Sequence, residues 1–195
     1  AFVYSKNLPA RFQGRALVCE PTMKLVALLD VQPDGAGYKA FAQGNIFASS
    51  DEWTSPVYAE VGPDGAVWVA DWQNFIIQHN PTPSPERGGY KANTGVGGAH
   101  ENPLRDHERG RIYRIVSKDA PRGNAPTLRP ADTQNLVAAL SSDIQYTRLD
   151  AQRLLVEGKK QDAVPALKRL LSNHSEGVAA IHALWTLHGL GALDT

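Results

Sequence analysis

The sequence has almost no cysteine and no long apolar stretch. Its 195 residues include one cysteine, Cys19, and one methionine. A single thiol cannot form a disulfide within the chain, and it excludes a CxxCH haem-attachment motif or a zinc site built from several cysteines. No apolar run approaches the roughly 18 residues that a membrane-spanning helix requires. The sequence therefore predicts no membrane span.

An excess of either charge is also missing. The 20 Lys and Arg residues are balanced by 20 Asp and Glu residues, so the net charge is zero. Proteins that bind nucleic acid or anionic membranes carry clustered positive charge, and we therefore predict no nucleic-acid partner. With 42% hydrophobic residues, the chain has enough apolar material to build a core.

The first half has the pattern of short β-strands. Turn-forming sequences occur at Asp34-Gly35 and Asp64-Gly65, and the first of them suits a hairpin turn with positive φ. Short strands joined by such turns are typical of a propeller or a sandwich rather than a βαβ fold. The predicted strands are 15–19, 24–30, 38–41, 45–48, 56–61, 66–70 and 110–116, with a long Gly/Pro-rich loop before the last one.

After a linker at 119–131, the apolar pattern changes to the 3.6-residue period of α-helices. Four helices are predicted, at 132–140, 143–157, 163–171 and 177–190, and Gly158 suits the end of the second one. Helix pairs of this size resemble HEAT repeats, which have about 40 residues each. Because stacked neighbours supply the core of such repeats, we expect the helical array to continue past Thr195.

Three longer strings point to a family. They run from Ser50 to Val57, from Val61 to Asn74 and from Asn102 to Ile115, and include the sequences SDEWTSPV, VGPDGAVWVADWQN and NPLRDHERGRIYRI. Together with the order of the predicted elements, they make the chain similar to the membrane-bound dehydrogenase family that is frequent in Planctomycetes and Verrucomicrobia. Members resemble the soluble glucose and sorbosone dehydrogenases. The Gly/Pro-rich loop at 81–100 departs from the short His-containing stretch that members often have there.

The resemblance implies a fold and a domain order. Residues 1–118 would be the C-terminal blades of a β-propeller, residues 119–131 a linker, and residues 132–195 the first HEAT-like repeats of an α-α superhelix. The chain would then be a fragment of a larger parent, and the rest of that parent would be its main partner. The resemblance further implies a periplasmic or secreted protein.

The resemblance also implies an activity. The parent would be a quinoprotein-like dehydrogenase that uses pyrroloquinoline quinone (PQQ) and Ca²⁺ to oxidise a sugar or polyol. Electrons would pass to a c-type haem domain outside this chain. Because one or two blades cannot enclose a cofactor, we expect the 195-residue chain alone to be inactive. The alternative is a non-catalytic scaffold that binds glycans or partner proteins.

Six residues are candidates for the chemistry. His79 and His107 are candidate catalytic bases, because imidazole suits proton abstraction from a hydroxyl at neutral pH. Carboxylates on loops are ligands that Ca²⁺ prefers, and arginines bind the carboxylates of a quinone. The candidate metal ligands are Asp71 and Asp106, and the candidate cofactor ligands are Arg111 and Arg114.

Each candidate also has a structural interpretation. An aspartate at the end of a strand often closes a turn, and the two histidines suit structural hydrogen bonds. Arg111 and Arg114 alternate on one predicted strand and therefore face opposite sides of the sheet. A salt bridge between blades of the propeller is the interpretation that we favour for each arginine.

Overall fold

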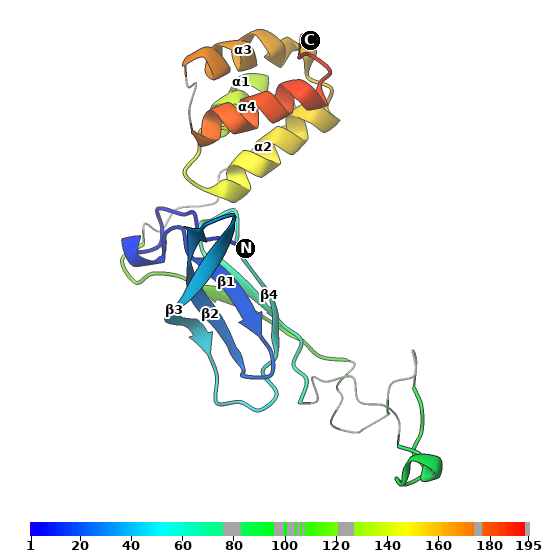
Figure 1. Cartoon of the computed structure of the whole chain (residues 1–195). Helices are drawn as coiled ribbons and strands as arrows, with labels where there is room; N and C mark the ends of the chain where they lie inside the picture. Colours follow the sequence, from blue (N-terminus) through cyan, green and yellow to red (C-terminus); the bar gives the residue numbers. More distant parts are fainter. Residues whose placement is uncertain are drawn as a thin grey trace. The chain divides into compact units, whose positions relative to one another are not determined.

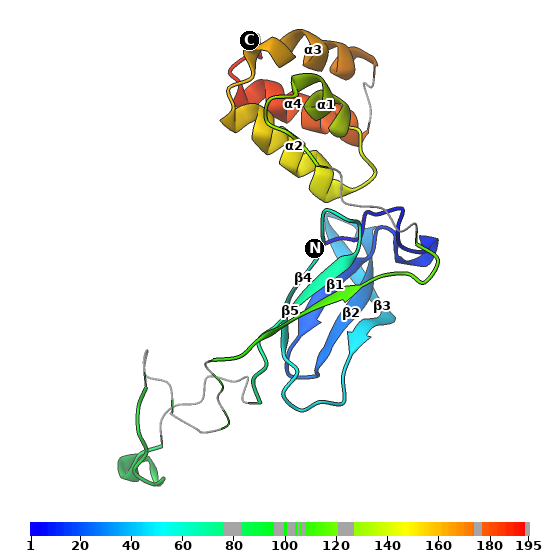
Figure 2. The same cartoon turned by 180° about the vertical axis from the view of Figure 1, so that it is seen from behind.

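The computed structural model describes residues 1–75, 83–95, 100, 104, 106, 108–120, 127–173 and 177–193. The chain forms two compact units. Unit 1 comprises Ala1, Arg15–Glu60 and Trp68–Ile115. Unit 2 comprises Phe2–Gly14, Val61–Val67 and Val116–Thr195. Figures 1 and 2 show the strands of the first half and the helices of the second half from opposite sides.

Two three-stranded sheets lie in unit 1, except for the strand-end residues Val61 and Val67, which belong to unit 2. The first has the order β1-β2-β3, with β1 at Ala16–Glu20, β2 at Leu25–Asp34 and β3 at Gly37–Ala48. All of its neighbouring strands are antiparallel, with Leu17 opposite Leu28 and Asp34 opposite Gly37. The second has the order β4-β5-β6, with β4 at Pro56–Val61, β5 at Val67–Asp71 and β6 at Arg111–Ile115.

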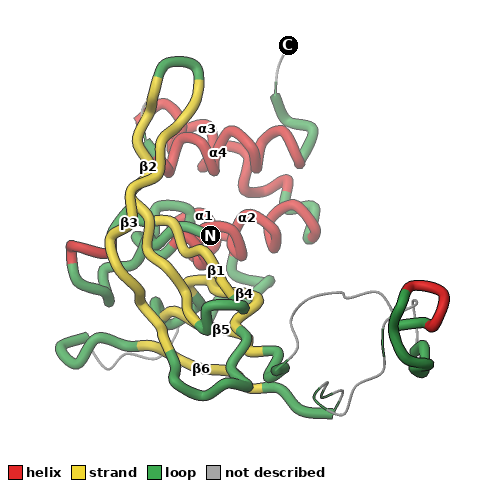
Figure 3. The backbone as a smooth tube through the Cα atoms, turned by 60° about the horizontal axis from the view of Figure 1, so that its bottom comes forward, coloured by secondary structure: helices red, strands yellow, loops and turns green. Residues whose placement is uncertain are grey.

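Figure 3 shows the long hairpin that β2 and β3 form. Two glycines in it have positive φ. Gly35 has φ of 59° in the turn, so the prediction of a positive-φ turn at Asp34-Gly35 is confirmed. Gly44 has φ of 98° inside β3, near the register shifts in the pairing of β2 with β3. The two short strands predicted at 38–41 and 45–48 are therefore one strand with a bulge, a feature that glycine favours.

Alternation along the strands gives unit 1 its core. Val26 and Leu28 in β2 are buried, as are Ala59 in β4 and Val69 in β5. Residues of this spacing share one face of a sheet, and their burial removes apolar surface from water. The opposite face of the second sheet keeps Trp68 and Ile112 exposed.

Unit 2 holds four α-helices. They are α1 at Thr133–Ala139, α2 at Gln145–Glu157, α3 at Val164–Asn173 and α4 at Val178–Gly189. Asp132 caps α1, because its carboxylate accepts a hydrogen bond from the Asn135 amide at 3.0 Å. Among the described residues no helix has the length and apolar character to cross a bilayer. Short 3-10 turns lie at Ala10–Phe12, Pro85–Arg87 and Gln161–Ala163.

One apolar cluster joins all four helices. Its buried members are Leu136, Leu140, Ala151, Leu155, Ala163, Leu167, Ala183, Leu187 and Leu190. Helix α4 also comes close to α2 at Gly189, where a Cβ atom would stand 2.7 Å from Val156 Cγ2. His182 on α4 reaches Gln152 on α2 through a side-chain hydrogen bond of 2.8 Å.

The predicted propeller is wrong for this structure. The six strands of the described residues form two open sheets of three strands, with no closed barrel or ring. A propeller blade is a four-stranded sheet, and several blades surround a central channel. Turn residues and β-branched strands were sufficient to place the strands. Those local features do not determine how many strands pair or whether the sheets close.

The predicted HEAT-like array is also wrong. In a solenoid each repeat contacts only its neighbours, whereas here α1, α2, α3 and α4 all contribute to one shared core. The helical period locates the apolar face of each helix but does not determine which helices pack together. The structure is a small mixed domain of sheets and helices, and the boundary predicted at residues 119–131 stays a prediction.

Gly65 provides a test of the turn between β4 and β5, which belongs to unit 2. Its φ is 75°, and a Cβ atom would stand 2.5 Å from Ser5 Oγ. We expect Gly65→Ala to lower the free energy of unfolding by about 2–4 kcal/mol, measured by urea denaturation with helix circular dichroism. The matched control is Gly191→Ala, because Gly191 has φ of 65° but no atom within 4 Å of the position that a Cβ would take. Equal losses in the two variants would show that the Ser5 contact is unimportant.

Candidate functional site

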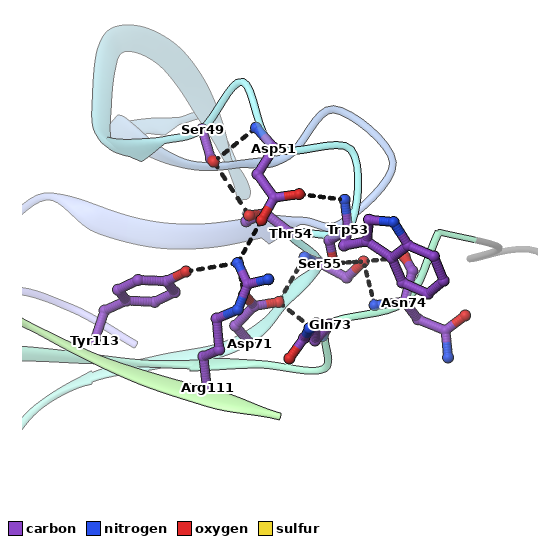
Figure 4. Close-up of polar contacts among 10 residues, drawn as sticks. All are labelled: Ser49, Asp51, Trp53, Thr54, Ser55, Asp71, Gln73, Asn74, Arg111 and Tyr113. Carbon is purple, nitrogen blue, oxygen red and sulfur yellow. Dashed lines mark hydrogen bonds and ion pairs between the residues drawn. The ribbon is translucent and has the colours of Figure 1, made fainter. Parts of the chain in front are cut away.

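Two of the predicted site residues come together in unit 1. Asp71 ends β5, and Arg111 begins the neighbouring strand β6. The Arg111 guanidinium Nη1 lies 3.9 Å from Asp71 Oδ2. Figure 4 shows both side chains within a network of polar contacts that also draws residues from the loops after β3 and β5. We call this network the Asp71 cluster, with members Asp51, Ser55, Asp71, Asn74, Arg111 and Tyr113.

The Asp71 carboxylate is buried and already serves backbone donors. Its side chain has no exposed surface. Oδ1 accepts hydrogen bonds from the Ser55 amide at 2.6 Å and from the Gln73 amide at 2.8 Å. Gln73 has φ of 53°, which is uncommon for a residue with a side chain. Asp71 thus holds both the approach to β4 and the strained turn after β5. Its Oδ2 has no hydrogen-bond partner in the described part of the chain.

Arg111 connects the cluster to the loop after β3. Its Nη1 donates to Asp51 Oδ2 at 2.5 Å and to the Tyr113 hydroxyl at 3.2 Å. The hydrogen bond to Tyr113, followed by that to Asp51, raises the pKa of Arg111. The hydrogen bond from the Trp53 amide, followed by that from Arg111, lowers the pKa of Asp51. Both groups are therefore held in their charged forms.

Ser55 and Asn74 close the network. The Ser55 hydroxyl donates to the backbone carbonyl oxygen of Asn74 at 2.5 Å, and the backbone amide of Asn74 donates back to Ser55 Oγ at 3.4 Å. Asn74 is fully buried, and its side-chain Nδ2 donates to the Asp106 carbonyl oxygen at 3.1 Å. Because these bonds fix backbone atoms on two loops, the arrangement is that of an internal brace.

The other predicted residues divide into two groups. Asp106 contributes its carbonyl oxygen to Asn74, but its carboxylate accepts from the Glu108 amide at 2.9 Å and the Arg109 amide at 3.1 Å. Arg114 lies on the other face of β6, where its guanidinium carbon is 5.9 Å from the centre of the Trp68 ring. His79 and His107 lie outside the described residues.

No residue set of the described part has the composition of a typical metal site. Within those residues no group of three or more His, Cys, Asp or Glu side chains could hold an ion. The Arg111 guanidinium beside Asp71 also opposes a cation there, because like charges repel strongly at such short range. The cluster is therefore suited to holding loops in place.

Four members of the cluster are not among the six candidates from the sequence: Asp51, Ser55, Asn74 and Tyr113. Asp51 and Ser55 belong to the string after β3, and Tyr113 lies two residues beyond Arg111 on β6. The pattern Asp51-Glu52-Trp53 does contain a local indication, since an aspartate that accepts from the amide two residues on forms an Asx turn. Nothing in the sequence shows that Asp51 also reaches Arg111, which is 60 residues away.

Asp71→Ala tests the brace. The change removes the acceptor for the Ser55 and Gln73 amides, and the Ser55 amide is buried. We expect the free energy of unfolding to fall by about 2–3 kcal/mol, measured by chemical denaturation. Asp51→Ala is the control, because its partly exposed ion pair with Arg111 should matter distinctly less. A larger loss for Asp51→Ala than for Asp71→Ala would contradict the assignment of Asp71 as the centre of the brace.

Comparison with known proteins places the chain in a family. None of the curated proteins and none of the solved structures that were compared matches it. A family model described as "Domain of unknown function (DUF7133)" matches residues 1–119, which is more than half of the chain and includes the whole Asp71 cluster. The chain therefore belongs to the DUF7133 family.

Proposed function

We propose that the chain is a fragment of a quinoprotein-like dehydrogenase that oxidises a sugar or polyol and passes electrons to a haem c domain outside this chain. The observation that carries this proposal is the position in the sequence of the residues that form the Asp71 cluster. Its members and its partner Asp106 come from the three strings that resemble the dehydrogenase family, at 50–57, 61–74 and 102–115.

The shared task of the strings supports the resemblance. Asp51 and Ser55 come from the first string, Asp71 and Asn74 from the second, and Arg111 from the third. Segments far apart in the sequence thus meet in one set of hydrogen bonds. A chance similarity of three separate strings would not require them to meet. We infer that the strings resemble the family because together they specify one structural brace.

The described residues do not fit PQQ or Ca²⁺. Ca²⁺ takes six to eight oxygen ligands, but Asp71 Oδ1 already accepts two amides and Oδ2 faces Arg111. Arg111 and Arg114 point to opposite faces of β6, so they do not grip one quinone together. We therefore place the quinone, the Ca²⁺ ion and the haem elsewhere in the proposed parent. His79 and His107 stay predictions as catalytic bases, and so does a periplasmic or secreted location.

The proposal is tested on the full-length parent and on the 195-residue chain. Each is incubated with PQQ and Ca²⁺ and assayed for reduction of an artificial electron acceptor over a panel of sugars and polyols. We expect turnover that depends on the quinone in the parent and none in the chain alone. A folded parent without quinone-dependent turnover would contradict the dehydrogenase. Turnover by the chain alone would contradict the expectation that the isolated chain is inactive.

A second candidate function is glycan binding, and exposed aromatic rings beside the Asp71 cluster favour it. The rings of Trp53 and Phe75 have centroids 6.1 Å apart, and Phe75 and Trp72 are exposed. Lys24 Nζ stands 5.9 Å from the centre of the Phe75 ring. Aromatic faces stack on the C–H face of a pyranose, and neighbouring polar groups bond its hydroxyls.

Trp53→Ala tests this second candidate. If the rings bind glycans, we expect the affinity of the chain for a soluble polysaccharide such as xylan or β-glucan to fall about tenfold, measured by affinity electrophoresis. Trp185→Ala is the matched control, because Trp185 is an exposed tryptophan on α4 in unit 2. Absence of binding by the folded wild-type chain, or equal weakening in both variants, would contradict a glycan site at Trp53.

A further inference from the structure

One tetrapeptide occurs at two places in the sequence and lies at a turn each time. Pro-Asp-Gly-Ala stands at 33–36, where β2 turns into β3, and again at 63–66, between β4 and β5. Both glycines have positive φ, 59° at Gly35 and 75° at Gly65. An aspartate before glycine is chemically labile, because glycine has no side chain to shield its amide nitrogen from the aspartate carboxyl group. The same reactive pair thus occurs in two environments.

The first turn is open to solvent. Asp34 and Gly35 are exposed, and no atom lies within 4 Å of the position that a Cβ on Gly35 would take. Asp34 pairs with Lys39 at 2.7 Å, but both side chains are exposed, and such a pair is weak. The residues of β3 from 37 to 45 are also exposed, so little packing holds this end of the hairpin (Figure 3).

The second turn is held on several sides. Gly65 is buried, and its amide donates to the Gly62 carbonyl oxygen at 3.0 Å. The Ser5 hydroxyl donates to the Gly65 carbonyl oxygen at 2.7 Å, and the Asn7 side chain donates to the Asp64 carbonyl oxygen at 2.8 Å. Asp64 Oδ1 accepts a hydrogen bond from the amide two residues further on at 3.1 Å. This turn cannot change conformation without breaking these bonds.

We propose that Asp34 is a site of spontaneous isomerisation to isoaspartate, whereas the fold protects Asp64 in the same tetrapeptide. The Gly35 amide nitrogen attacks Cγ of the Asp34 carboxyl group in its protonated form. The N–Cγ bond forms, a Cγ–O bond breaks, and the amide proton leaves with the hydroxyl group as water. The product is a five-membered succinimide ring that joins the two residues.

Water then opens the ring in one of two ways. Addition at the side-chain carbonyl restores aspartate. Addition at the main-chain carbonyl of Asp34 breaks its bond to the Gly35 nitrogen and gives isoaspartate, in which the main chain runs through the Asp34 side chain. The water taken up replaces the water released, so the isomerisation needs no oxidant or other co-reactant.

The difference between the sites is one of freedom to close the ring. Ring closure needs rotation of both the main chain and the side chain, and it occurs where a segment opens locally at low cost. In the first turn the exposed pair with Lys39 is the contact of Asp34 that must yield. The isomerisation is independent of the proposed dehydrogenase role, because it depends on the turn alone.

The modified chain should keep its fold. Isoaspartate lengthens the main chain by one atom at the turn, and this disturbs the pairing of Asp34 with Gly37. The buried part of the first sheet, where Leu17 lies opposite Leu28, is at the other end of β2. We therefore expect the change to be confined to the tip of the hairpin.

Incubation of the folded 195-residue chain near neutral pH tests the proposal. Samples taken over weeks are digested, and electron-transfer dissociation in a mass spectrometer distinguishes isoaspartate from aspartate at each position. We expect isoaspartate to accumulate at Asp34 and to form at least about tenfold more slowly at Asp64, because ring closure there breaks hydrogen bonds. In the urea-unfolded chain the two sites should convert at similar rates, since their tetrapeptides are identical.

Ser5→Ala separates the effect of the fold from that of the local sequence. The variant loses the hydrogen bond to the Gly65 carbonyl oxygen, with circular dichroism to confirm folding. We expect it to speed conversion at Asp64 about threefold or more and to leave the rate at Asp34 unchanged. Asp34 is thus the control site within the same molecule.

Two results would overturn the proposal. The first is equal conversion of Asp34 and Asp64 in the folded chain. The second is no isoaspartate at Asp34 in the folded chain after a time in which the urea-unfolded chain has accumulated it. An unchanged rate at Asp64 in folded Ser5→Ala would contradict the protection of the second turn by its contact with Ser5.

Discussion

A carboxylate that is removed from water must be compensated by hydrogen bonds or by an opposite charge. The carboxylate of Asp71 in unit 1 is fully buried and has this requirement. It meets the requirement with the amides of Ser55 and Gln73 and with the nearby guanidinium of Arg111. Because these partners lie on three separate stretches of chain, satisfying one side chain fixes the course of two loops and the start of β6. The half-buried ring of Trp53 and the exposed ring of Phe75 stand on the loops that are fixed in this way.

This constraint explains why the residues with the most reactive side chains are poor candidates for catalysis here. Arg111 is occupied by Asp51 and Tyr113, and Asp106 is occupied by amides of its own loop. The proposed dehydrogenase therefore needs its quinone and metal ligands from other parts of the parent. What this chain contributes is a rigid surface in unit 1.

Local features of the structure could be predicted from the sequence. The strands predicted at 15–19, 24–30, 56–61, 66–70 and 110–116 all correspond to observed strands. The four predicted helices correspond to the observed α1, α2, α3 and α4. The residues that determine these elements act within a few positions of one another, as Gly35 does in its turn and Asp132 at the start of α1. Asp71 and Arg111 were both singled out as candidates, but as ligands of a metal and of a quinone, and their pairing with each other was not predicted.

The assembly of these elements could not be predicted. Three-stranded sheets and a core shared by four helices depend on contacts between distant segments, which neither turn residues nor periodicity specify. The interpretation as a propeller followed by HEAT repeats was therefore an error of assembly. The roles of Asp51 and Ser55 were missed for the same reason, because their partners Arg111 and Asn74 are 60 and 19 residues away.

The most direct test of the brace is amide hydrogen exchange, measured residue by residue by NMR. The Ser55 and Gln73 amides lie at or beyond the ends of β4 and β5, yet both donate to Asp71 Oδ1. The brace predicts that both exchange as slowly as the amides in the middle of β5. Exchange at the rate of exposed loop amides would show that Asp71 does not hold these segments, and the account of unit 1 would then be wrong.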